Sequence, residues 1–289
     1  MSPALRTALL TALTLCAFAA NSILARAALR DGGMDPLAFT AIRIASGALM
    51  LALLLKRSGQ PLAGDWTSAA ALVAYAAAFS VAYVAIPAGT GALLLFGAVQ
   101  VTMIGSGLAQ GDRPPWQEWG GVLISFTGLL VFLLPGLTRP PLAGSLLMLA
   151  AGIAWAVYSL RGRGGSGASG DPLAATAGNF LRGLPLALLP WVLFGGLRLS
   201  TTGIACALAS GALASGLGYA LWYTVLPRLK ALQASLVQLA VPLLVAVIGI
   251  LLLGEAPSLR LLSAALLILG GLALATLYRV ERVAAPRKA

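Results

Sequence analysis

The sequence predicts an all-α membrane protein with ten transmembrane helices, arranged as two inverted five-helix repeats. Three observations carry this prediction: a strongly apolar composition, ten apolar runs of membrane-spanning length, and matching segments in the two halves of the chain. The first identifies lipid as the surrounding solvent. The second sets the number of spans, and the third sets how the spans are related.

The composition departs far from that of a soluble protein. Hydrophobic residues make up 60% of the chain and charged residues only 9%, whereas soluble domains are about 45–50% apolar and about 25% charged. So few charges could not cover a water-exposed surface. A soluble enzyme, a disordered regulator and a secreted disulfide scaffold are therefore excluded.

Ten apolar runs follow one another along the chain. A helix needs about 20 apolar residues to cross the hydrocarbon of a bilayer, and the runs lack the alternation of barrel strands. The first run has the features of a signal peptide but stays apolar to about Ala28, which favours an uncleaved first helix. The predicted spans are 5–29, 36–55, 66–86, 89–109, 118–136, 142–160, 172–195, 203–226, 231–253 and 258–278.

The net charge of +11 is spread over the short segments between these runs. It therefore indicates topology rather than nucleic-acid binding, because Lys and Arg favour cytoplasmic loops. With the N-terminus inside, twelve basic residues lie in cytoplasmic segments and five in outer ones, Arg26, Arg30, Arg139, Arg198 and Arg260. We expect a multi-pass protein of a bacterial-type inner membrane, in contact with lipid, with both termini cytoplasmic.

Two pairs of segments indicate an internal repeat. Residues 111–132 resemble 254–275 at an offset of 143, and Asp35–Ala38 recurs at 171–174 at an offset of 136. The predicted repeats are 1–138 and 139–289, which form one integral membrane unit without a soluble domain. Since five is odd, the second repeat enters the membrane from the opposite side. Inverted repeats with a binding site near the midplane are typical of secondary transporters.

Three segments carry a family resemblance. They are PLAFTAIR (36–43), GSLLMLAAGIAWAVYSLR (144–161) and ALQASLVQLAVPLLVAVIGILLLGE (231–255). They resemble the EamA-type ten-helix branch of the drug/metabolite transporter (DMT) superfamily, and the resemblance extends over nearly the whole chain. It implies an exporter of small metabolites. The chain length and the aromatic-bearing helices look most like exporters of the YddG type, which export aromatic and other amino acids.

Charged residues inside the predicted spans are few. All eight acids lie at or outside span ends, so we expect no intramembrane carboxylate for proton or cation coupling. This favours facilitated diffusion of a zwitterion, or coupling through another group. Arg43 and Arg182 are the charges within spans. Arg43 could extend toward the membrane surface, and either arginine could meet a substrate carboxylate or the backbone carbonyls of a neighbouring helix.

Aromatic and amide side chains complete the candidate site. Aromatic stripes on the third, sixth and eighth runs fit either helix packing or a pocket wall, and deep amides fit either interhelical bonding or ligand binding. Trp66, Trp116 and Trp119 fit an interfacial belt instead. The predicted substrate-binding residues are Asn21, Phe79, Tyr83, Gln100, Trp155, Tyr158, Asn179, Arg182, Tyr223 and Gln238.

Other chemistry is not indicated. The chain has no histidine, which excludes His-dependent metal sites and nucleophiles, and we predict no catalytic residue, metal or cofactor. Cys16 and Cys206 are expected to be reduced and buried. Glu255 and Pro257 are expected to begin the last helix, and Asp112 and Pro114 the fifth.

The predicted function is export of amino acids, aromatic ones included, by alternating access. Export of another small metabolite or drug-like compound is the alternative within the same superfamily. An intramembrane enzyme and an assembly subunit are the alternatives of a different class. The sequence leaves the oligomeric state open.

Overall fold

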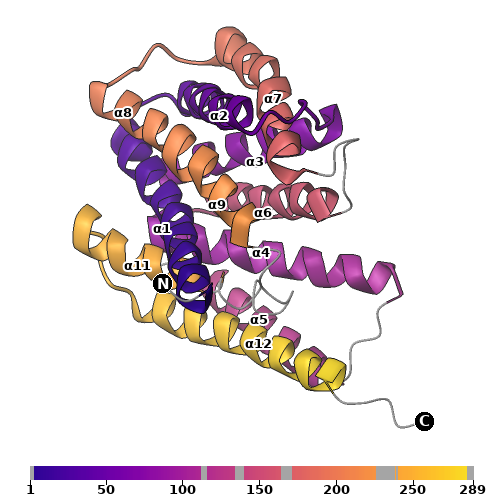
Figure 1. The fold of residues 1–289 in the computed structure, drawn as a ribbon. Coiled ribbons are helices and arrows are strands. Elements are labelled where there is room, and N and C mark those ends of the chain that lie inside the picture. The colour runs from indigo at the N-terminus through magenta and orange to yellow at the C-terminus, as the bar shows by residue number, and fades with distance from the viewer. Residues whose placement is uncertain are drawn as a thin grey trace.

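The structure is a computed structural model that describes residues 3–111, 116–133, 140–163, 171–225, 238 and 240–284. Within these residues the chain is helical, with no strand. Figure 1 shows the long helices stacked side by side, with α2 and α7 at one edge of the bundle and α12 beside α5 at the other.

The described helices follow the predicted runs closely, although the start of the run 231–253 and the end of the run 118–136 lie outside the described residues. They are α1 (Pro3–Leu29), α2 (Pro36–Ser58), α3 (Trp66–Ala85), α4 (Ala88–Ala109), α5 (Trp116–Leu133), α6 (Leu142–Arg163), α7 (Pro172–Phe194), α8 (Thr201–Ala209), α9 (Gly218–Val225), α11 (Ala240–Leu253) and α12 (Leu259–Ala284). A 3-10 turn, η1 (Arg30–Gly32), follows α1, and a π-helical segment, η2 (Ser210–Leu217), joins α8 to α9.

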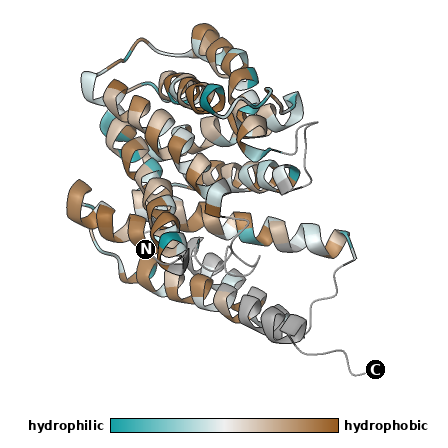
Figure 2. Cartoon of the chain, in the orientation of Figure 1, coloured by the Kyte–Doolittle hydropathy of each residue, from teal (hydrophilic) through white to brown (hydrophobic). Residues whose placement is uncertain are grey.

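Seven of the helices in the described part of the chain are long and apolar enough to cross a membrane. One of these is the continuous rod of α8, η2 and α9, and two shorter apolar helices correspond to α11 and the first part of α12. Figure 2 shows hydrophobic residues predominating along the helices. The chain is therefore a multi-pass membrane protein whose described part is all-helical. The number of ten spans and their inverted relation remain predictions.

The helices pack around α3 and α6. α3 lies against α6 and α7, α6 also lies against α4, and α1 crosses the rod of α8, η2 and α9 before contacting α11. Small residues allow the closest crossings: a Cβ at Gly152 of α6 would meet the Leu95 carbonyl oxygen of α4 at 2.5 Å. Such small-residue contacts are how membrane helices approach closely. They bring the side chains of α3 and α6 into one buried cluster.

Several helices begin at an aspartate that caps them. Asp35 precedes α2 and Asp171 precedes α7, each accepting a hydrogen bond from a backbone amide of the first turn, with proline at the first helical position. An aspartate N-cap followed by proline satisfies or removes the unpaired amides of a helix start. The other described acids lie in loops, in η1, or within the first or last turn of a helix, which agrees with the prediction that no acid lies deep in a span.

The prediction that Glu255 and Pro257 begin the last helix is wrong, because α12 begins at Leu259. Glu255 instead reaches across to α4, where its Oε1 accepts a hydrogen bond from the Ala88 amide at 2.7 Å. It lies 3.6 Å from Arg26 Nε as well. The residue before α4 is a proline without a capping side chain, so this helix start takes its cap from another segment. Asp112 and Pro114 lie outside the described residues.

The exposure of the tryptophans and cysteines tests where the sequence predicts them to lie. Trp66, Trp116 and Trp119 are exposed, in agreement with an interfacial role. The expectation for the cysteines is wrong for Cys16, which lies exposed on α1, while Cys206 is half-buried. A small apolar thiol is tolerated against lipid, so its position within an apolar run does not decide which way it faces.

Asp65 links the start of α3 to the end of α6. Its carboxylate accepts hydrogen bonds from the Ser68 amide at 2.9 Å, from the Ser68 hydroxyl at 2.7 Å and from Arg161 Nη2 at 3.0 Å. Burial alone would raise the pKa of Asp65, but the bonds from Ser68 and Arg161 outweigh it and hold the pKa below the ordinary 3.8.

We expect Asp65→Ala to lower the Tm of the detergent-solubilised protein at pH 7, because losing an N-cap costs about 0.5–2 kcal/mol. Since the pKa is depressed in the folded chain, the contribution is complete above the unfolded-state pKa and is lost as pH falls through the folded-state pKa. The difference in Tm should therefore narrow below about pH 4. Arg161→Ala keeps the cap and should lower Tm less. Equal Tm for Asp65→Ala and wild type at pH 7 would contradict this role.

Candidate functional site

A cluster of aromatic rings fills the middle of the bundle. Trp155 of α6 is at its centre, with ring centroids 5.0 Å from Tyr75, 5.2 Å from Tyr219 and 5.6 Å from Tyr158. Aromatic pairs at such distances attract one another beyond their simple burial. We define the central aromatic cluster as Phe18, Tyr75, Phe79, Tyr83, Trp155, Tyr158, Phe180 and Tyr219, which are contributed by α1, α3, α6, α7 and α9.

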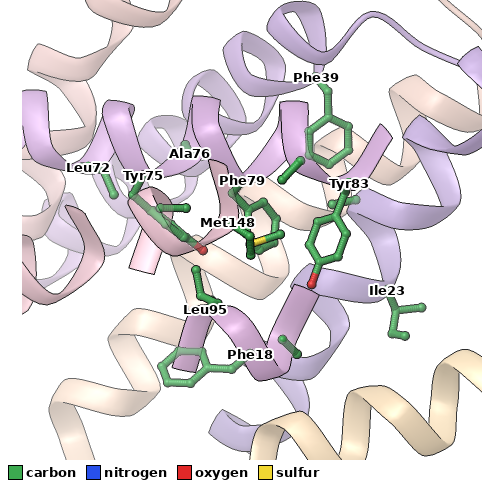
Figure 3. Packing of buried hydrophobic residues seen from close by; sticks show 14 of the residues in the cluster. Phe18, Ile23, Phe39, Leu72, Tyr75, Ala76, Phe79, Tyr83, Leu95 and Met148 are labelled. Atoms are coloured by element: carbon green, nitrogen blue, oxygen red, sulfur yellow. The ribbon is translucent and has the colours of Figure 1, made fainter. Parts of the chain in front are cut away.

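The α3 part of the cluster follows from helical spacing. Tyr75, Phe79 and Tyr83 are four residues apart and therefore share one face; their successive centroids are 5.4 and 4.7 Å apart. Figure 3 shows the three rings projecting from one side of α3, with Met148 beside Phe79. The Tyr83 hydroxyl donates to the Ala88 carbonyl at 3.3 Å, which gives this buried phenol its partner.

Arg43 of α2 lies against this face. Its guanidinium carbon is 5.1 Å from the centroids of both Tyr75 and Phe79. Nε donates to the Ser215 hydroxyl at 3.2 Å and Nη2 to the Tyr75 hydroxyl at 3.1 Å. The side chain is 1% exposed, so it does not extend to the membrane surface, which was one of the alternatives. Nη1 is buried and has no hydrogen-bond partner among the described residues.

The π-helical segment η2 forms the other side of the Arg43 site. Gly211 lies directly against α2, where a Cβ would overlap the Arg43 carbonyl oxygen and the Ser46 hydroxyl. Ser210 donates to Asn21 Oδ1 of α1 at 2.5 Å. π-helical turns inside α-helices occur frequently at functional sites. Here η2 brings two serine hydroxyls to buried polar side chains of α1 and α2.

The structure brings together some of the predicted site residues. Phe79, Tyr83, Trp155 and Tyr158 all belong to the central aromatic cluster, and Asn21 contacts η2 through Ser210. Gln100 is buried in α4. The side chain of Tyr223 lies outside the described part, and Gln238 is half-buried.

Asn179 and Arg182 lie elsewhere. Asn179 Oδ1 accepts from the Asp65 amide at 2.9 Å, and Arg182 Nη1 donates to the Ala63 carbonyl at 2.8 Å. Both therefore bind the loop before α3. Asp65 and Tyr83 are near opposite ends of α3, separated by about 27 Å at 1.5 Å per residue. Of the two alternatives for Arg182, the structure shows bonding to backbone carbonyls.

Arg43, Tyr75, Ser215 and Tyr219 join the site although they are missing from the predicted set. Tyr75 and Tyr219 could have been included on spacing, since each lies one helical turn from a predicted aromatic residue. The position of Ser215 depends on how η2 packs against α2, which no local pattern reveals.

A groove of about 780 Å³ opens near the end of α3 that carries Tyr83. Arg26 lines it and donates through Nη1 to the Tyr83 and Val84 carbonyls at 2.9 and 3.0 Å. Glu255, which caps α4, lines it too. These contacts form a polar layer between the groove and the Tyr83 end of the central aromatic cluster.

Comparisons with known proteins agree with this architecture. A model of the EamA-like transporter family matches residues 5–134 and again residues 142–277. An uncharacterized protein of Pseudomonas aeruginosa is 56% identical over 98% of both chains, and an uncharacterized transporter of Archaeoglobus fulgidus is 28% identical over 87% of this chain and 91% of its own. A crystal structure of a further protein has a TM-score of 0.68 at 24% identity, over 93% of this chain and 98% of that one, which shows a shared fold. The chain belongs to the EamA-like transporter family of membrane proteins.

Proposed function

We propose that this protein exports amino acids, including aromatic ones, across an inner membrane by alternating access between two inverted repeats. Family membership points to a transporter of small substrates rather than an enzyme. One observation of the structure carries the substrate proposal: Arg43, a buried cation, lies against a cluster of aromatic rings in the middle of the bundle. Rings accommodate a flat side chain, and a guanidinium pairs with a carboxylate.

The inverted repeat is supported by local equivalences between the halves. The family model matches each half separately. At the predicted offset of 136, Asp35 and Asp171 cap their helices in the same way. Thr40 and Thr176, at that same offset, each donate to the carbonyl four residues earlier at 2.8 Å. In this reading α1 to α5 correspond to the five spans from α6 to α12.

The pairing of the helices fits the same scheme. α3 packs on α6, and reciprocally the rod of α8, η2 and α9 packs on α1; α4 packs on α6, and α11 on α1. A two-fold relation between halves requires such reciprocal contacts. The site then lies where the two halves meet, as expected for carriers built from inverted repeats.

The substrate would replace contacts that the rings now make with one another. Trp155 contacts rings from α3, α6 and α9, so a side chain inserted beside it would be held by more than one helix. A flat wall of this kind favours an aromatic side chain while admitting a smaller one.

Trp155→Ala should weaken the apparent affinity for phenylalanine by roughly two- to tenfold, since an aromatic pair is worth about 0.5–1.5 kcal/mol beyond area burial. The affinity for alanine should fall less, because alanine has no ring to stack. The measurement is counterflow of each radiolabelled amino acid in proteoliposomes, normalised to reconstituted protein. Trp66→Ala, at an exposed position on α3, is the matched control and should change the apparent affinity for neither substrate. Equal losses for both substrates in Trp155→Ala would mean that the ring only packs the bundle.

The proposed topology can be tested by labelling single cysteines in a Cys16→Ala, Cys206→Ala background. Gln60 is exposed in the loop after α2, which the charge bias places in the cytoplasm, and Leu197 is exposed in the loop after α7, on the outer side. In intact cells, a membrane-impermeant maleimide should label Leu197→Cys and not Gln60→Cys. The opposite pattern would reverse the orientation, and labelling of both in sealed cells would refute the proposed topology.

A further inference from the structure

Arg43 is a buried charge without a counter-charge. The two ion pairs among the described residues involve Arg26 and Arg161, and none of the described acids contacts Arg43. A buried guanidinium is costly in an apolar medium unless it is paired. Two hydrogen bonds and two aromatic faces offset part of this cost, but Nη1 is left without a partner in the described part of the chain.

The fold itself does not require an arginine at this place. At the offset of 136, Arg43 corresponds to Asn179, between Thr40 and Gly47 in one half and Thr176 and Gly183 in the other. Asn179 is equally buried, at 4% exposed, and its Oδ1 accepts from a backbone amide. A neutral amide therefore serves in the second half, and the cation in the first half calls for an explanation beyond helix packing.

Arg182 shows what a structural arginine of this bundle does. Its Nη1 donates to two backbone carbonyls, of Ala63 and Gly178, at 2.8 and 3.1 Å. Arg43 instead donates to hydroxyl groups, through Nε and Nη2, and has Nη1 to spare beside Tyr75 and Phe79. Of Arg43 and Arg182, Arg43 is the one with a buried donor that lacks a partner among the described residues.

We propose that Arg43 binds the carboxylate of the substrate. The substrate class is then a compound with a carboxylate and an aromatic ring, and an ammonium group is not required for binding. This inference rests on the proposed function and specifies the site. One guanidinium neutralises one negative charge, so a carboxylate gives a neutral buried pair, whereas a phosphate dianion leaves an excess charge that no other described side chain at the site offsets. No described acid contacts the site to bind an ammonium group in the same way.

The test compares four ligands that share a phenyl ring: phenylalanine, 3-phenylpropionate, phenethylamine and phenyl phosphate. Each competes against radiolabelled phenylalanine exchange in proteoliposomes containing wild-type protein, Arg43→Gln or the control Arg161→Gln, which removes a cation from the Asp65 pair outside the site. For wild type and the control, the inhibition constant of 3-phenylpropionate should lie within about tenfold of that of phenylalanine. Phenethylamine and phenyl phosphate should compete far more weakly. In Arg43→Gln the preference for 3-phenylpropionate over phenethylamine should fall about 10- to 100-fold, the range for a hydrogen bond to a charged group.

The ratio between ligands does not depend on how much protein is folded. An unchanged ratio in Arg43→Gln, or an equal loss of affinity for all ligands, would overturn the proposal and leave Arg43 as a helix-packing residue. Stronger competition by phenyl phosphate than by 3-phenylpropionate would overturn the choice of carboxylate. If Arg43→Gln does not fold, Arg43→Lys can be used, because it keeps the charge but not the planar fork. The affinity of Arg43→Lys for 3-phenylpropionate should be several-fold lower than that of wild type. An affinity equal to that of wild type would refute the proposal.

A second readout separates this inference from the proposed function. If wild-type protein does not exchange phenylalanine, the export of aromatic amino acids is refuted. The rise in Tm that 3-phenylpropionate causes in detergent-solubilised protein still tests the anion site, since a ligand of the folded state stabilises it. That rise should be present in wild type and Arg161→Gln and absent in Arg43→Gln. Its absence in wild type, or its persistence in Arg43→Gln, would overturn the role of Arg43.

Discussion

Hydrocarbon offers polar groups no water, so every polar side chain of this bundle must find its partner within the protein. Threonines solve this locally: Thr14, Thr40 and Thr176 each donate to the carbonyl four residues earlier. Acidic residues lie near helix ends, where a carboxylate can accept hydrogen bonds from the unpaired amides of a first turn. The remaining deep polar groups must reach another helix, and the positions where they do so determine how the helices are held together.

α3 is the helix most affected by this constraint. At one end Asp65 caps the helix and binds Arg161 of α6. At the other end the Tyr83 and Val84 carbonyls accept from Arg26 of α1, which also pairs with Glu255. The aromatic face of α3 lies between these two polar layers. Each end of α3 is therefore held to a neighbouring helix by a charged side chain, by Arg161 of α6 at one end and by Arg26 of α1 at the other.

Local features of the chain are predictable from sequence, and contacts between helices are not. The helix positions follow from apolar length, and the starts of α2 and α7 follow from an aspartate before a proline, because both depend on neighbouring residues alone. Orientation is harder, since a helix that is apolar on all sides has no periodic pattern to show which face is buried. This is why Cys16 was expected inside, and why Glu255 was assigned to its own helix rather than to α4. Phe79, Tyr83, Trp155 and Tyr158 were identified correctly as neighbours on helix faces. The positions of Arg182 beside backbone carbonyls and of Arg43 beside Tyr75 and Phe79 were not predictable, because they depend on which groups of other segments lie within reach.

The difference between Arg43 and Asn179 has a consequence for a carrier built from two related halves. If the two positions were identical, a substrate would find the same polar group on either side of the midplane and could bind in two opposite orientations. Under the proposal, a cation in one half alone would define a single orientation, with the carboxylate toward α2 and η2 and the side chain toward Trp155 and Tyr75. Asn179 meanwhile binds the loop before α3, so the same position in the second half holds the helices together. Under the proposed repeat, this departure from symmetry would separate the substrate-binding role proposed for Arg43 from the structural role of Asn179.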